Sequence, residues 1–175
     1  MPRLRSLPLP CAALALLASC TSTVAFEKMV PEPAELERSH ELTVQVQCEG
    51  SPDPWIGGQL VADDALHRAV VQAIEDSKLF EAVVYTDADV ELRVRFVELE
   101  EPEVGLDQTA RVELDWRLTD SATHKQVWHK AVKTEYTADT LDADFMAERE
   151  RLAIERALQK NIQRGVLLLS KAEIQ

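Results

Sequence analysis

The segment Ala110-Arg-Val-Glu-Leu-Asp-Trp-Arg-Leu-Thr-Asp120 decides the fold class of this chain. Apolar and charged side chains alternate strictly along it. The apolar set comprises Ala110, Val112, Leu114, Trp116 and Leu118. A period of two is typical of a β-strand that is buried on one face only. The sheet that contains this strand should therefore have one face in water and one face covered by other elements.

Two neighbouring segments predict further strands. Residues 90–96 alternate in the same way, and the linker 98–108 has the composition of a hairpin loop. Residues 126–137 form a third segment, whose phase is disturbed because Val127 and Trp128 are adjacent and both apolar. A bulge or an edge position would explain that disturbance. Three consecutive strands with short connections predict an antiparallel meander.

One more strand and two helices complete the prediction. Residues 42–48 alternate, which predicts a strand ahead of the meander. Residues 63–78 and, over a longer stretch, about 143–170 carry apolar stripes at spacings of three and four, as amphipathic helices do. The predicted order is β-α-β-β-β-α. We expect an α+β fold, a two-layer sandwich in which two helices cover a four-stranded, mainly antiparallel sheet.

The N-terminus has the features of a lipoprotein signal peptide. Arg3 and Arg5 precede an apolar run of about ten residues, which suits export and is too short for a transmembrane helix of roughly twenty residues. The run ends in Leu17-Ala18-Ser19-Cys20, which resembles the lipobox of bacterial lipoproteins. The resemblance implies cleavage between Ser19 and Cys20, with lipid on Cys20 and anchoring in a membrane.

These features divide the chain into three parts. Residues 1–19 are the expected signal peptide, and residues 41–175 are expected to form a single periplasmic α/β domain. Between them, residues 20–40 contain Pro31 and Pro33 and show no clear period. We therefore expect a lipidated N-terminus and a flexible tether, which would span roughly 25 Å as a coil.

Composition argues against several functions. The 175 residues carry a net charge of −12, which opposes binding to nucleic acid through the bulk field. The histidines His40, His67, His124 and His129 lack metal-type spacing, and we expect solvated surface residues. Acidic clusters in 98–103 and 139–144 lack the spacing of a calcium loop. We expect no metal, no cofactor beyond the covalent lipid on Cys20, and no enzymatic activity. A hydrolase is a remote alternative, because no nucleophile–base set can be named.

Cys48 and the tryptophans complete the candidate residues. Cys48 has no partner thiol in the mature chain and falls on the apolar phase of its strand, so a buried, inert thiol is expected. Trp116 and Trp128 are expected to pack on the sheet. Trp55 and Ile56 lie in a polar, proline-rich loop, and tryptophan is enriched at interface hot spots. We consider them the candidate partner contact. The alternatives are that Trp55 covers the core as a lid, or that recognition uses an open edge of the sheet.

The whole pattern is similar to a loose group of small Gram-negative envelope lipoproteins. The features that carry the likeness are the lipobox, Leu79-Phe80 at a helix end, Val90-x-Leu-x-Val-x-Phe96, Trp116-Arg-Leu-Thr-Asp120, Val127-Trp128 and a closing helix with Ala153–Asn161. The chain resembles the LptE type, the YajG type and the auxiliary lipoproteins of lipid-transport ABC systems. The resemblance implies a non-catalytic accessory or structural subunit of an envelope assembly or transport complex, with an envelope protein as partner.

The resemblance also implies a location. Thr21, rather than aspartate, follows Cys20. In such lipoproteins this implies the outer membrane, with the domain facing the periplasm; the inner membrane is the alternative. The acidic charge argues against direct binding of lipopolysaccharide. A small lipid- or peptide-binding module, with an apolar groove between sheet and helices, is the alternative function.

Overall fold

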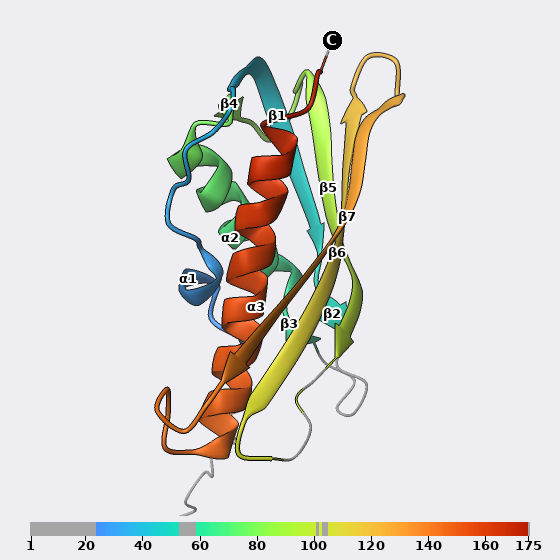
Figure 1. Cartoon of the computed structure of the whole chain (residues 1–175). Coiled ribbons are helices and arrows are strands. Elements are labelled where there is room, and N and C mark those ends of the chain that lie inside the picture. The colour runs from blue at the N-terminus through green and yellow to red at the C-terminus, as the bar shows by residue number, and fades with distance from the viewer. Residues whose placement is uncertain (1–23, 53–58, 101, 103–104, 175) are drawn as a thin grey trace, which may run out of the picture.

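The computed structural model describes residues 24–52, 59–100, 102 and 105–174. The elements, in chain order, are α1 (Phe26–Met29), β1 (His40–Glu49), β2 (Ser51–Pro52), β3 (Gln59–Val61), α2 (Asp63–Ser77), β4 (Phe80–Val83), β5 (Val90–Glu100), β6 (Gln108–Asp120), β7 (Gln126–Ala138) and α3 (Met146–Leu169). Five strands form one sheet in the order β4-β1-β5-β6-β7, and β2 and β3 form a separate antiparallel pair. The helices lie on one side of the large sheet (Figure 1).

The predicted α+β sandwich is confirmed, with one strand more than the predicted four. The extra strand, β4, pairs in parallel with β1, with Val83 opposite Val44. Four residues are too few to show a clear alternation, which is why the sequence pattern did not reveal β4. β1 also runs parallel to β5, so the antiparallel part of the sheet consists of β5, β6 and β7. The pairing of β6 with β7 shifts near Leu118, which confirms the disturbed phase of β7.

The core lies between the sheet and the two long helices, and Trp116 is at its centre. This side chain is fully buried, and its indole Nε1 donates a hydrogen bond of 3.2 Å to Oδ1 of Asn161 on α3. The Nδ2 group of Asn161 donates in turn to the carbonyl oxygen of Val132 at 2.7 Å. Gly165 lies one helical turn further along, against the Trp116 ring. A Cβ atom there would come within 2.4 Å of two ring carbons, so this contact requires glycine.

A third helix, α1, lies in a segment for which the sequence predicted a flexible tether. Residues 24–39, which we call the N-terminal segment, pack on the two long helices instead, with Val24 4% exposed and Met29 fully buried. The guanidinium of Arg68 on α2 stacks over the Phe26 ring, 3.5 Å from its centroid. Two prolines exclude a long helix here, but they leave apolar side chains free to fill the space between α2 and α3. The tether prediction is therefore wrong for residues 24–39, and residues 20–23 lie outside the described residues.

The first strand of the large sheet, β1, begins at His40, two residues ahead of the predicted alternation. The predicted end of the first helix is confirmed, since Lys78 caps α2 in a left-handed conformation with φ of 55°. α3 begins at Met146, three residues later than expected. Within the described residues, no helix combines the length and hydropathy that crossing a bilayer requires.

Candidate functional site

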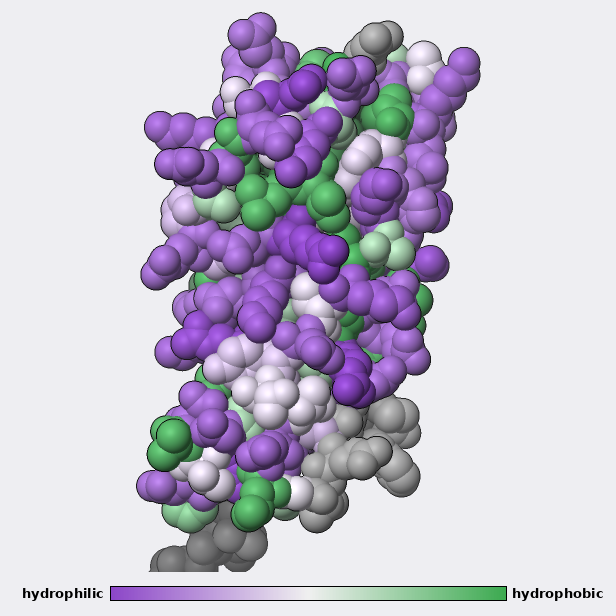
Figure 2. Space-filling view, in the orientation of Figure 1, coloured by the Kyte–Doolittle hydropathy of each residue, from purple (hydrophilic) through white to green (hydrophobic). Residues whose placement is uncertain are grey.

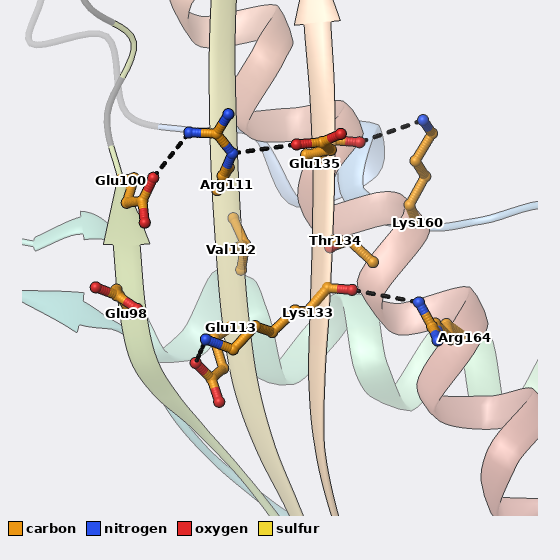
Figure 3. A pocket seen from close by; sticks show the side chains of 10 residues that line it. All are labelled: Glu98, Glu100, Arg111, Val112, Glu113, Lys133, Thr134, Glu135, Lys160 and Arg164. Atoms are coloured by element: carbon orange, nitrogen blue, oxygen red, sulfur yellow. Dashed lines mark hydrogen bonds and ion pairs between the residues drawn. The ribbon is translucent and has the colours of Figure 1, made fainter.

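The face of the sheet opposite the helices carries charged side chains that neighbour one another across the strands. Arg111 on β6 lies opposite Glu100 on β5 and Glu135 on β7. Its guanidinium forms ion pairs with both, through Nη1 at 3.0 Å and Nε at 3.1 Å, respectively (Figure 3). The hydrogen bonds that the guanidinium donates to these two carboxylates raise the pKa of Arg111.

A second cross-strand ion pair lies two residues along β6. Nζ of Lys133 on β7 is 2.8 Å from Oε2 of Glu113, and this hydrogen bond raises the pKa of Lys133. The Glu113 side chain is only 15% exposed, whereas that of Lys133 is 72% exposed. Of the two charged groups, the ammonium of Lys133 is therefore the one that is accessible to a partner.

These side chains line a groove of about 460 Å³, which we call the charged groove. Its lining consists of Glu98, Glu100, Arg111, Val112, Glu113, Lys133, Thr134, Glu135, Lys160 and Arg164 (Figure 3). Four of these residues are acidic and four are basic, so the groove is balanced in charge within a chain of net charge −12. Such a surface suits a partner that also presents charges of both signs.

Two basic residues of the charged groove come from α3 and reach the outer edge of β7. Nζ of Lys160 donates to the carbonyl oxygen of Glu135 at 3.3 Å, and Nη1 of Arg164 donates to that of Lys133 at 3.4 Å. The free carbonyls of an edge strand are the groups that an added strand would use. The open-edge hypothesis is therefore disfavoured along this part of β7, because a pairing strand would first have to displace two side chains.

The expected site residues have different outcomes. Ser19, Cys20, Trp55 and Ile56 lie outside the described residues, so lipidation and the loop contact stay predictions. Cys48 is a free, half-buried cysteine, and burial raises the pKa of its thiol, which makes it a poor nucleophile.

The expectation of solvated histidines is wrong at two positions. His40 is 7% exposed, its ring packs against Phe80, and its Nε2 lies 3.1 Å from the carbonyl oxygen of Leu169. His67 is half-buried, with Nε2 3.1 Å from the Val46 carbonyl oxygen. Each ring serves to join a strand or a helix to its neighbour.

The acidic clusters have structural partners. Glu98 and Glu100 are on β5 rather than in a loop, and Glu100 pairs with Arg111. Asp139 accepts a hydrogen bond of 2.7 Å from the backbone N–H of Leu141. In the part of the chain that the structure describes, no group of three or more histidine, cysteine, aspartate or glutamate side chains could hold a metal ion.

The fold is shared with solved bacterial proteins. No protein-family model and no curated protein matches the sequence. The chain is similar to protein XCC0632 from Xanthomonas campestris, family DUF330, with 21% identity, a TM-score of 0.59, and coverage of 80% of this chain and 91% of that one. It is also similar to the protein CT253 from Chlamydia trachomatis, with 8% identity, a TM-score of 0.54, and coverage of 77% and 97%. At these identities the two likenesses show a common fold.

A lipoprotein is among the further similar structures. The minor lipoprotein from Acinetobacter baumannii has 9% identity and a TM-score of 0.46, with coverage of 73% of this chain and 90% of that one. The predicted resemblance to the LptE and YajG types stays a prediction.

Proposed function

We propose that this chain is a lipid-anchored lipoprotein of the outer membrane, facing the periplasm, and a non-catalytic accessory subunit of an envelope assembly or transport complex. The signal peptide and lipobox ahead of Cys20 support the anchor. The charged groove is the surface through which we expect it to bind its protein partner. The absence of a nameable nucleophile–base set in the sequence supports a role in binding rather than catalysis.

One observation carries the assignment of the binding surface: eight charges of both signs gather in one groove. Six are on the open face of the sheet, and two, Lys160 and Arg164, come from α3 at the edge of β7. Exposed ion pairs contribute little to the stability of a fold. Across an interface the same charges select the partner and increase the association rate. The concentration of paired charges is therefore better explained by recognition than by stability.

The alternative of an apolar ligand groove between sheet and helices is less well supported. Fully buried side chains fill that layer, including Trp116 on β6 and Leu158 and Ile162 on α3. A ligand there would have to displace a packed core, which costs free energy.

Site-specific cross-linking in cells tests the proposal. A photo-reactive residue at Glu135, in the charged groove, should trap one specific envelope protein, whereas the same residue at Arg93, on the open face but outside the groove, should trap it at least about tenfold less. The double reversal Arg111→Glu and Lys133→Glu should abolish the cross-link. It replaces both central cations with carboxylates, which then have the same charge as the glutamates beside them. Recovery of the monomer alone, or equal trapping from both positions, would overturn the assignment.

A separate experiment tests the anchor. The Cys20→Ala variant should lack acylation by mass spectrometry and should leave the membrane fraction. Continued sedimentation of this variant with lipid would contradict the anchor without bearing on the charged groove.

A further inference from the structure

Four large apolar side chains are exposed at one end of the domain. They are Leu106 (76% exposed), Leu141 (93%), Phe145 (70%) and Met146 (47%). Leu106 precedes β6, Leu141 and Phe145 lie between β7 and α3, and Met146 is the first residue of α3. Since Gln108 pairs with Ala138, the connections before β6 and after β7 leave the sheet at the same end. This is the lower end in Figure 1, and Figure 2 shows green patches there among hydrophilic surface. We call these four residues the apolar end.

The connection between β7 and α3 is held in shape by hydrogen bonds. Nη1 of the buried Arg149 donates to the carbonyl oxygens of Ala143 and Asp144, at 2.7 and 2.9 Å. Asp139 fixes the turn before it through the backbone N–H of Leu141. A backbone held in this way cannot fold its apolar side chains back onto the core. A cluster of exposed apolar residues is typical of a surface that meets another apolar phase.

The direction of the N-terminal segment bears on where the expected lipid anchor can lie. Residues later in this segment contact residues later in α3. The N–H of Ala25 donates to the Glu155 carboxylate, and the side-chain amide of Gln159 donates to the carbonyl oxygen of Val30. Further on, Glu37 pairs with Lys171. The segment therefore runs parallel to α3, and followed backwards from Val24 it leads towards the first turn of that helix.

The length of α3 ahead of Glu155 can be compared with the reach of the chain ahead of Val24. From Glu155 back to Met146 is nine residues of helix, or about 14 Å at a rise of 1.5 Å per residue. From Val24 back to Cys20 is four residues, which span at most about 14 Å. Four residues are therefore enough for Cys20 to reach the level of the apolar end.

We propose that the apolar end inserts into the membrane beside the lipid anchor, so that the domain contacts the bilayer at two points and has a fixed orientation. This inference depends on the acylation of Cys20 in the proposed function. Leu141 and Phe145, the two most exposed members on the β7–α3 connection, are the side chains that enter the boundary between headgroups and acyl chains. The charged groove then faces sideways, within a few nanometres of the membrane surface.

The acidic residues around the apolar end determine which headgroup charge it should prefer. Asp139, Asp142 and Asp144 lie next to Leu141 and Phe145 in the chain, and all are acidic. Anionic headgroups would repel these carboxylates over the Debye length of about 10 Å at 0.1 M salt. The apolar end should therefore prefer a zwitterionic surface.

Fluorescence on the full acylated protein tests the proposal. The free thiol is removed by Cys48→Ser, acylation of Cys20 is verified by mass, and a polarity-sensitive dye is attached after Leu141→Cys, Phe145→Cys or, as control, Tyr85→Cys. Tyr85 is 89% exposed and lies in the connection between β4 and β5. The first residue of β5, Val90, pairs with Asp120, the last residue of β6, so this connection is remote from the end of the sheet where β6 begins. In phosphatidylcholine vesicles, the dye at 141 and 145 should shift to the blue and be quenched by bromolipids, and the dye at 85 should not. Equal responses at all three positions would overturn the inference. So would a blue shift without lipid that grows with protein concentration, which would indicate contact between copies.

A second measurement separates this inference from the anchor. In the Cys20→Ala background, flotation with phosphatidylcholine vesicles should show weak binding that falls at least about tenfold on Leu141→Ser with Phe145→Ser. Phosphatidylglycerol in the vesicles should weaken that binding. Unchanged flotation of the double variant would overturn the apolar end, whatever the state of Cys20. Full flotation of Cys20→Ala that the double variant abolishes would instead overturn the anchor and retain the apolar end.

Discussion

Along β6, residues of even number point to the helices and residues of odd number point to the open face. The even set, from Ala110 to Leu118, is at most 2% exposed and includes Trp116. The odd set carries Arg111 and Glu113, whose ion pairs lie in the charged groove. Burial of apolar surface is the main stabilising contribution to a fold, and exposed ion pairs add little. One strand thus separates stability from recognition, and the following variants test that separation.

The largest expected effect is that of Trp116→Ala. The change removes a fully buried ring and leaves Asn161 without its indole donor, so it should lower the free energy of unfolding by about 3–5 kcal/mol. Urea denaturation followed by circular dichroism measures this. The matched control, Trp128→Ala, removes a half-buried tryptophan from β7 and should cost clearly less. Equal losses would mean that the contribution of a tryptophan to stability does not follow its burial.

Gly165→Ala tests the packing of the inner face more finely. In an exposed helix this change stabilises by about 1 kcal/mol. Here the added Cβ lies 2.4 Å from the Trp116 ring, so we expect a net destabilisation of about 1–2 kcal/mol. Combined with Trp116→Phe, the same change should cost less, because the smaller ring leaves room. Additive losses in the double variant would contradict this contact.

The parts of the fold that depend on local pattern were predictable. The alternation around Trp116 predicted a strand with one covered face, and the spacing of apolar residues predicted α2 to its end at Lys78. In both elements the signal repeats over many residues, so the chain itself specifies the period. The α+β sandwich followed from the order of these elements.

The parts that depend on distant contacts were not predictable. β4 is short, and its parallel pairing with β1 leaves no local mark. The N-terminal segment packs only because α2 and α3 already provide a surface, so its prolines suggested a tether. The charged groove depends on the register that places Arg111 opposite Glu135. An alternation of charges along each strand was visible, but only pairing of the strands shows which charges meet.

A smaller effect on stability is expected at Asp89, just before β5. Its carboxylate accepts hydrogen bonds from the backbone N–H and the hydroxyl of Thr43 on β1, at 2.8 and 2.7 Å. These bonds lower the pKa of Asp89. A lowered pKa in the folded state means stability that is present above the unfolded value of about 3.9 and is lost as the pH falls through the folded value.

Asp89→Asn should therefore lower Tm by about 3 °C at pH 7, and the difference from the wild type should shrink below about pH 4. Thermal unfolding from pH 7 to pH 2 measures it. Asp87→Asn, in the same turn and also exposed, is the matched control and should leave Tm unchanged. A constant difference at every pH would show that the charge of Asp89 is not the source of the effect.

The smallest effect is expected in the charged groove itself. Glu113→Lys places a second cation on β6, directly opposite Lys133 on β7. It should lower Tm by about 2 °C, since Lys133 loses the carboxylate that raises its pKa. Adding Lys133→Glu restores a pair of opposite charges, and Tm should return to within about 1 °C of the wild type. Partner cross-linking from Glu135 should be lost in the double variant as well as in the single one. The ion pair is intact in the double variant, but its two charges have exchanged strands. Recovery of both stability and cross-linking would mean that the partner does not distinguish the order of charges, and the separation of the two faces would then hold without the charged groove as the specific contact.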